Sequence, residues 1–383
     1  MPPRRDSFFE SSVPRSRATR WISAVVAAVA FLAIARAAIP QLLPARPVVA
    51  VAADVDDAIE EVVATEAIDR EAVHGRRAEG AGVPAEVEIT LPRETTFSEV
   101  NSEIARAIRG TGATVLDAVE TGSAPERPEG LFLELGTEGA VTHRVKLEQD
   151  RSPAKAPGDP RIAIVFDDLG WSMTGLAADL LDFPAPVTFA ILPGLPHSDE
   201  YAKAARDRGH EIILHVPMEP MDVAHHDPGD GAIRPGLPAE ENRRRMQSAL
   251  AGLSGYVGVS NHMGSRVTSD ESLMDLCLSV IRSHDPDLFF LDSRTTPYSV
   301  VPARARRHGV RTLTNNLFLD GGDEGQRLAG VRASRLASIA RRKGSAIAIG
   351  HVHPETVEAV REAIEEWERQ GIRLVPLSDL MHR

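Results

Sequence analysis

Cysteine is almost absent from this sequence of 383 residues, and aromatic residues make up only 4% of it. Because Cys277 stands alone, the chain has no intramolecular disulfide and no zinc site built from several thiolates. Cys277 lies in the apolar stretch SLMDLCLSVI, which predicts a thiol packed in a core. A basic excess is also missing, since the formal net charge is -12, and we therefore expect no nucleic-acid partner. The hydrophobic content of 43% is typical of a globular protein.

Charges are absent from an apolar run near the start, WISAVVAAVAFLAIA, at residues 21–35. Arginines precede this run at positions 4, 5, 15, 17 and 20. A basic flank before an apolar run is typical of an export signal or of a single membrane anchor whose basic end stays in the cytoplasm. We expect residues 1–20 to be the cytoplasmic flank and residues 21–43 to be a transmembrane anchor or a signal segment. Two alternatives stay open, because small residues around 35–38 permit cleavage: an inner-membrane protein with an extracytoplasmic C-terminal domain, or a protein secreted to the periplasm.

Composition divides the middle of the chain into three segments. Residues 44–85 are rich in alanine, valine and acidic residues without a sustained apolar face, and we interpret them as a flexible tether, either throughout or with a weak helix near residues 55–72. Residues 86–150 contain a strand-like run, a helical run that ends at a glycine, and two more strand-like runs around a turn, which predicts a small α+β module. Residues 151–160, RSPAKAPGDP, contain three prolines and predict a linker.

Short apolar runs alternate with helical segments throughout residues 161–383. The runs include IAIVF, PVTFAIL, HEIILHV, YVGVSNH, LFFLDS and SAIAIGH, and segments such as SDEYAKAARDRG and PETVEAVREAIEEWERQG separate them. This alternation predicts an α/β fold with a parallel sheet and outer helices. Seven or eight strands over this length favour a (β/α) barrel, distorted or incomplete, over a small open sheet.

Aspartate and histidine follow strand after strand in this region: Asp167, Asp168, His215, His262, Asp292 and His351. The carboxyl ends of parallel strands in a barrel share one face, where active sites form. Imidazoles and carboxylates without thiolates suit Zn²⁺, or another divalent first-row ion, with a position left open. A further carboxylate can take a proton and a separate histidine can give one. The pattern therefore predicts a metal-assisted hydrolase of an amide or an ester.

The motifs FDDLG, PVTFAILPG, RGHEIILHVPMEP, NHMGSR, FFLDSRTTP and AIGHVHP, in this order, resemble those of the divergent polysaccharide deacetylases. This family is distantly related to the NodB-homology deacetylases, and the resemblance covers about residues 160–380. It implies an exported, metal-dependent enzyme that deacetylates N-acylated sugars of an envelope polysaccharide. A second hypothesis is a catalytically inactive, deacetylase-like protein that binds glycans or acts as a scaffold in the envelope.

The resemblance also implies roles for individual residues. Asp167 is similar to the base that activates water at the metal, Asp168 to the metal carboxylate, and His215 to the first metal histidine. The family motif has a second histidine four residues after the first, where this chain has Glu219. Either Glu219 is the third ligand or His262 supplies the missing imidazole. We favour His262, because it stands at the next strand end.

The proton donor and the surrounding residues follow from the same motifs. His351 is similar to the general acid, and His353 either shares that role or holds His351 in place. Further residues are expected to line the cleft or to support a ligand: Asn261, Ser265, Arg266, Asp292, Ser293 and Arg294. Of these, Arg266 or Arg294 either pairs with Asp167 or is a solvated loop charge, while Asp292 and Ser293 are expected to orient a ligand. The aromatic residues best placed to stack on a sugar are Trp171 and Tyr298.

Overall fold

The computed structural model describes residues 47–381, apart from residues 67, 77–82, 94, 122–128, 152–158 and 322–325. The expected cytoplasmic flank (1–20), the expected membrane segment (21–43) and most of the expected linker (151–160) lie outside the described residues. Contacts divide the chain into Met1–Pro47 and Val48–Arg383, and every helix and strand that the structure describes lies in the second unit. Within the described part of the chain, no helix is long and apolar enough to cross a membrane.

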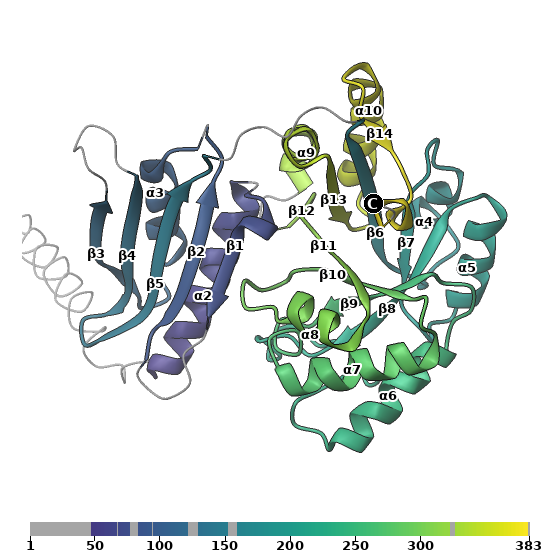
Figure 1. The fold of residues 1–383 in the computed structure, drawn as a ribbon, viewed down its shortest axis with the longest axis horizontal. Coiled ribbons are helices and arrows are strands. Elements are labelled where there is room, and N and C mark those ends of the chain that lie inside the picture. The colour runs from purple at the N-terminus through teal and green to yellow at the C-terminus, as the bar shows by residue number, and fades with distance from the viewer. Residues whose placement is uncertain are drawn as a thin grey trace, which may run out of the picture. The chain divides into compact units, whose positions relative to one another are not determined.

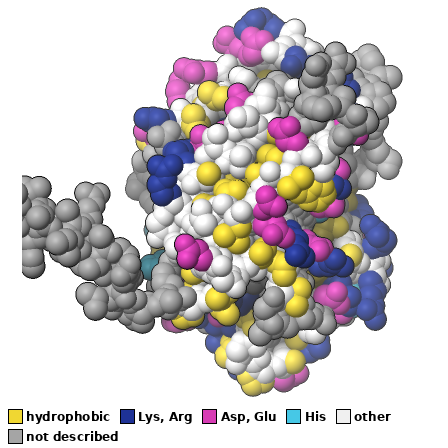
Figure 2. Space-filling view, turned by 90° about the vertical axis from the view of Figure 1, so that its left-hand side faces the viewer, with side chains coloured by type: hydrophobic (Ala, Val, Ile, Leu, Met, Phe, Trp, Pro, Cys, Tyr) yellow, Lys and Arg dark blue, Asp and Glu magenta, His cyan; other side chains and the backbone are white. Residues whose placement is uncertain are grey.

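The N-terminal module, residues 48–149, is a five-stranded sheet with two helices packed on one face (Figure 1). Its helices are α2 (Val48–Thr65) and α3 (Phe97–Ala107), and its strands are β1 (Val73–Arg76), β2 (Ala85–Leu91), β3 (Thr114–Thr121), β4 (Gly130–Thr137) and β5 (Ala140–Gln149). The strand order is β1-β2-β5-β4-β3, in which β2 and β5 are parallel and the other pairs are antiparallel. Alternate residues of β4, such as Leu131 and Leu133, are buried against the helices. Seen from the side of β3, acidic, basic and hydrophobic side chains are interspersed (Figure 2).

The tether expected over residues 44–85 is wrong for the residues that the structure describes there. Helix α2 buries Val51, Val55 and Ile59, which recur every four residues and so form one apolar face. Acidic residues stand between these positions in the sequence and made the segment resemble a polar tether. The module therefore begins at Val48 and not at residue 86.

The second part, from residue 161, is an α/β structure with nine strands. These are β6 (Arg161–Leu169), β7 (Thr188–Ile191), β8 (Glu211–Met218), β9 (Gly258–Met263), β10 (Phe289–Asp292), β11 (Arg311–Thr314), β12 (Leu317–Phe318), β13 (Ser345–Gly350) and β14 (Arg373–Leu374). The order is β11-β10-β9-β8-β7-β6-β13-β12, with β14 paired to β6, and every pairing is parallel.

This sheet curls into a half-barrel (Figure 1). The predicted parallel α/β architecture is confirmed, and the barrel is incomplete because the terminal strands β11 and β12 of this order do not pair with each other. The sheet has nine described strands, where seven or eight were expected. The two extra strands, β12 and β14, are each two residues long, which is too short to form a recognisable apolar run in the sequence. The connecting helices are α4 (Leu176–Asp179), α5 (Ser198–Asp207), α6 (Ala239–Ala251), α7 (Glu271–His284), α8 (Val301–His308), α9 (Ala329–Lys343) and α10 (Pro354–Arg369).

Both faces of the curled sheet are covered, which is why its strands read as continuous apolar runs. In β6, Ile162, Ile164 and Phe166 join the large core between the sheet and the helices. The alternate residues Ala163 and Val165 join a smaller core on the concave side. Cys277 of α7 is buried in the large core, as predicted. With both cores filled by side chains, the carboxyl edge of the strands is left to hold polar groups.

Candidate active site

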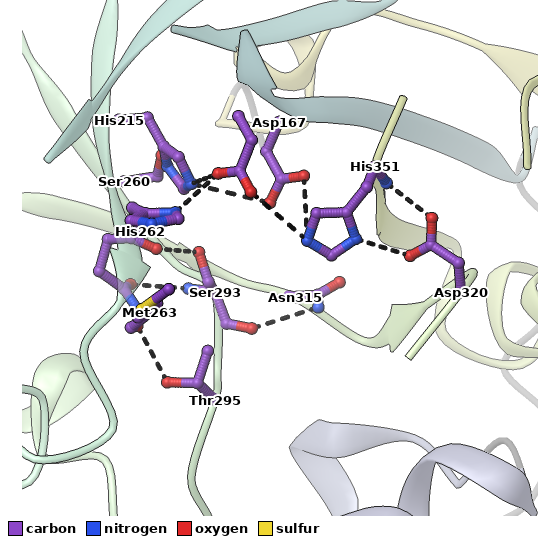
Figure 3. Close-up of polar contacts among 12 residues, drawn as sticks. Asp167, His215, Ser260, His262, Met263, Ser293, Thr295, Asn315, Asp320 and His351 are labelled. Carbon is purple, nitrogen blue, oxygen red and sulfur yellow. Dashed lines mark hydrogen bonds and ion pairs between the residues drawn. The ribbon is translucent and has the colours of Figure 1, made fainter. Parts of the chain in front are cut away.

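The candidate residues come together at the carboxyl edge of the half-barrel (Figure 3). Asp167 and Asp168 lie near the end of β6, His215 lies in β8 and His262 in β9. His351 follows the last residue of β13, which is the neighbour of β6 on its other side. The residues therefore form two groups, one on each side of β6.

The first group consists of Asp168, His215 and His262. Asp168 Oδ1 lies 2.6 Å from His262 Nδ1 and 3.3 Å from His215 Nε2. One ligand atom from each of the three residues lies within 4.8 Å of the others. Asp168 Oδ1 is buried and faces both ring nitrogens. A carboxylate and two imidazoles that converge in this way fit the ligand set of a catalytic zinc site.

His215 is held in the form that binds a metal. Its Nδ1 lies 2.7 Å from Ser260 Oγ on the adjacent strand β9, which leaves Nε2 facing Asp168. Burial lowers the pKa of His215 to about 4, and the contact with Asp168 only partly opposes this shift. The imidazole is therefore neutral at neutral pH, as metal coordination requires. Ser260 was not predicted, although it immediately precedes the Asn261-His262 pair.

The carboxylate of Asp168 stays ionised despite its burial. Burial by itself would raise the pKa of Asp168, but the contacts with His215 and His262 outweigh it and lower this pKa below its usual range. The backbone of Asp168 has a φ of 59°. A left-handed conformation costs a non-glycine residue about 1 to 3 kcal/mol, and residues of this kind cluster at functional sites.

The second group consists of Asp167, His351 and Asp320. His351 Nε2 lies 3.6 Å from Asp167 Oδ1, and His351 Nδ1 lies 2.9 Å from Asp320 Oδ1. The charge of Asp167, opposed by burial and assisted by Asp320, raises the pKa of His351 to about 10. His351 is therefore a cation at neutral pH, with a carboxylate facing each ring nitrogen. Burial, opposed by His351 and assisted by Asp168, raises the pKa of Asp167 above its usual value.

Asp320 was not predicted from the sequence. Its Oδ2 accepts hydrogen bonds of 2.8 Å from the backbone N–H of His351 and from Thr356 Oγ1. The contacts with His351 and Thr356 lower the pKa of Asp320 against the effect of its burial, which would raise it. Asp320 follows the two-residue strand β12, so it belongs with the aspartate and histidine residues that were selected because they follow strands. That strand is too short to stand out in the sequence.

Glu219 does not belong to the first group, Asp168, His215 and His262, which we call the metal group. Its carboxylate lies 3.4 Å from Arg266 Nη1 and 3.8 Å from Arg234 Nη1. His262, and not Glu219, lies with Asp168 and His215 in the described structure.

The expected pairing of Arg266 or Arg294 with Asp167 is wrong. Arg266 contacts Glu219 and the carbonyl oxygen of Met221, and Arg294 donates to the carbonyl oxygen of Val73. His351 occupies the position beside Asp167 that these arginines were expected to fill.

The remaining predicted residues support the loops around the site. Asn261 Oδ1 accepts a hydrogen bond from Ser293 N, and Ser293 Oγ donates to Asn261 O. The buried Asp292 accepts hydrogen bonds from Arg294 N and Ser299 Oγ, so it shapes a loop and was wrongly expected to orient a ligand. Ser265 Oγ accepts a hydrogen bond from Met221 N.

Three further predicted residues, His353, Trp171 and Tyr298, lie at different places relative to the site. His353 donates its backbone N–H to His351 O, and the two ring centroids are 6.0 Å apart. Trp171 is 64% exposed and lines a cavity of about 570 Å³ that reaches Asp168 and His262. Tyr298 is buried in the core of the N-terminal module, so the expectation that it stacks on a sugar is wrong.

Known proteins resemble the region that holds these groups. A family model described as divergent polysaccharide deacetylase matches residues 164–381. An uncharacterized Haemophilus influenzae protein is 34% identical over 222 residues, which are 57% of this chain and 76% of that protein. The uncharacterized protein YibQ of Escherichia coli is 33% identical over 224 residues, or 58% of this chain and 67% of that one. The crystal structure of the uncharacterized protein ATU2773 from Agrobacterium tumefaciens matches with a TM-score of 0.55 and 28% identity, over 60% of this chain and 92% of that one. The matched family region contains both candidate groups and begins after the N-terminal module.

Proposed function

The chain belongs to the divergent polysaccharide deacetylase family, and from this premise we propose that it is a metal-dependent hydrolase that removes the acyl group from N-acylated sugars of an envelope polysaccharide. One observation carries the proposal: the imidazoles of His215 and His262 converge with Asp168 on one side of Asp167, and the cationic imidazole of His351 lies on the other. Amide hydrolysis needs both halves, because one polarises the carbonyl and the other supplies a proton to the leaving nitrogen.

Asp168, His215 and His262 would hold the metal, with His215 binding through Nε2 and His262 through Nδ1. A divalent metal such as Zn²⁺, when bound there, would supply Lewis acidity to the amide carbonyl and the attacking water. Ser260 fixes the ring of His215, in the way that outer hydrogen bonds orient metal ligands. The neutral state of His215 means that no proton has to leave this ring before the metal binds.

Asp167 and His351 would move the protons. A carboxylate oxygen of Asp167 takes a proton from the attacking water, and His351 Nε2 gives a proton to the nitrogen of the leaving sugar amine. Asp320 holds Nδ1 of His351, so Nε2 faces the reacting atoms. The raised pKa of His351 keeps this proton available at neutral and mildly alkaline pH.

The cavity beside the metal group suits a sugar ring. Besides Asp168 and His262 it is lined by Trp171, Asp230 and Arg245. An exposed indole offers a flat apolar face, while carboxylate and guanidinium groups offer hydrogen bonds to hydroxyl groups. We place the sugar that carries the acyl group there, with Trp171 against its ring.

The proposal also includes export. Residues 1–20 would stay in the cytoplasm, residues 21–43 would anchor the chain in the inner membrane or be cleaved, and the remainder would face the envelope. Alkaline phosphatase fused after residue 383 is expected to be active in a bacterial host. An inactive fusion, with an active cytoplasmic reporter at the same junction, would contradict export.

The activity is tested with the full chain loaded with Zn²⁺ and supplied with N-acetylated oligosaccharides. We expect acetate release that stops when the metal is removed by a chelator and returns when Zn²⁺ is restored. Stoichiometric zinc with glycan binding but no release of acyl groups, from chitin-derived and peptidoglycan-derived fragments alike, would overturn the enzyme and favour the inactive glycan-binding alternative.

A further inference from the structure

The N-terminal module contacts a loop of the half-barrel through buried polar groups. Arg70 Nη1, which also pairs with Glu60, donates a hydrogen bond of 2.6 Å to the carbonyl oxygen of Arg294. In return, Arg294 Nη2 donates a hydrogen bond of 2.6 Å to the carbonyl oxygen of Val73 in β1. Both arginine side chains are buried. In the loop after β10, Arg294 therefore both accepts a hydrogen bond from the N-terminal module and donates one to it.

Two further contacts hold the same loop three and four residues on. The N–H of Gly75 donates to the carbonyl oxygen of Pro297 at 2.9 Å. Tyr298 Oη donates to Asp56 Oδ1 at 2.6 Å, and His143 Nε2 lies 2.8 Å from the same oxygen. A Cβ atom at Gly75 would lie 2.5 Å from the ring of Tyr298, so only glycine allows this approach. His143 of strand β5 is buried in this contact.

The loop leads directly to a proposed metal ligand. Thr295, next to Arg294, donates through Oγ1 to the carbonyl oxygen of Met263 at 3.1 Å. Asn261 Nδ2 donates to the same oxygen at 2.7 Å. Met263 immediately follows His262 and has a φ of 53°. The backbone next to the His262 ring is thus held by two hydrogen bonds in a left-handed conformation.

Residues with a strained backbone lie both in the metal site and in the loop that contacts the N-terminal module. Among the described residues, the non-glycine residues with positive φ are Asp168, Met263 and Arg294. Asp168 and His262 belong to the metal group, while Arg294 is the residue that the module holds. Conformations of this kind persist when the surroundings over-determine them. At Arg294 those surroundings include the N-terminal module.

We propose that Arg70 and Thr295 are positioning residues for the metal ligand His262, so that the N-terminal module helps to build the metal site. The proposal rests on the metal site of the proposed function. Arg70 lies outside residues 164–381, the part that the family model matches. A metal site loses affinity when the groups behind a ligand no longer hold it in place, even though the ligand itself is unchanged.

The test measures Zn²⁺ affinity of the full chain by competition with a chromogenic chelator, together with the visible spectrum of bound Co²⁺. We expect Thr295→Val to weaken zinc binding about tenfold and Arg70→Met to weaken it by a similar or smaller factor, since outer partners of a ligand contribute about 10- to 100-fold. Both variants are expected to alter the Co²⁺ spectrum. Arg70→Lys, which keeps a donor, is expected to restore the affinity.

Arg76→Met is the matched control, because Arg76 lies in the same module but is exposed and pairs with Glu86. It is expected to bind zinc as the wild type does. The double variant Arg70→Met/Thr295→Val is expected to lose less affinity than the product of the single losses, since both act along one path.

Wild-type affinity in both single variants, with an unchanged Co²⁺ spectrum, overturns the positioning role even if their thermal stability falls. If Arg70→Met fails to fold, Thr295→Val decides by the same criterion. If the wild-type chain binds no zinc at this site, the proposed function itself is contradicted. This outcome can be distinguished from equal zinc affinity in the wild type and the variants, which contradicts only the positioning role.

Discussion

The two sides of Asp167 contain the same kind of residue in opposite states. His215 is enclosed by protein and its pKa falls to about 4, whereas His351 lies between carboxylates and its pKa rises to about 10. The enclosed ring is a neutral donor of an electron pair, and the ring between carboxylates is a donor of a proton. Burial and partners, and not residue type, thus divide the site into a metal side and a proton side.

Removing the metal side is expected to have the largest effect. His215→Ala should weaken zinc binding by more than about 100-fold and abolish deacetylation, since even outer partners of a ligand contribute about 10- to 100-fold. Metal content after dialysis and acetate release measure the two losses. His225→Ala is the control, because His225 is exposed and contacts Asp222 away from the metal group. Equal losses in both variants would contradict the assignment.

Removing the base should separate chemistry from metal binding. Asp167→Asn keeps the shape of the side chain but cannot accept the proton, so kcat should fall by about 10²- to 10⁴-fold. Zinc affinity should change little, because the proposed metal ligands are Asp168, His215 and His262, and the carboxylate of Asp167 faces His351. Steady-state kinetics and zinc competition check the two halves of this prediction. Unchanged kcat would show that another group takes the proton.

Weakening the proton side is expected to move the pH profile. Asp320 raises the pKa of His351, so Asp320→Asn should lower that pKa. In the proposed mechanism His351 is the acid in its protonated form, so activity is expected to fall as pH rises through its pKa. The alkaline limb of kcat should therefore move to lower pH, with kcat at neutral pH reduced by about tenfold or more. Thr356→Val, which removes one hydrogen bond to Asp320, should shift the limb less. A limb that stays in place would separate Asp320 from the acid.

The smallest effect is expected at Glu219. Glu219→Gln should leave zinc affinity and stoichiometry as in the wild type, because the carboxylate faces Arg234 and Arg266. Equilibrium dialysis against Zn²⁺ checks this. Strong loss of zinc would make Glu219 a ligand and would blur the division between the two sides.

The sequence was informative wherever a strand was long enough to recognise. Asp167, Asp168, His215, His262 and His351 all stand at or near the ends of apolar runs, and the parallel sheet brings those ends together. Asp320 was hidden by a two-residue strand, and its partner lies 31 residues further along the chain.

Long-range contacts explain the other failures. Arg294 and Tyr298 read as cleft residues because their stretch follows a strand end, but both contact the N-terminal module. No local pattern shows that a chain segment more than 200 residues earlier is the partner. Only a weak helix near residues 55–72 was considered where α2 (Val48–Thr65) lies, since the apolar positions of α2 alternate with acidic ones.

The division of the site is tested most directly by anomalous diffraction at the zinc edge from a zinc-loaded crystal of the full chain. We predict one strong peak bound by Asp168, His215 Nε2 and His262 Nδ1, with His351 left hydrogen-bonded to Asp320. A zinc peak between Asp167 and His351, or at Glu219 in place of His262, would contradict this division.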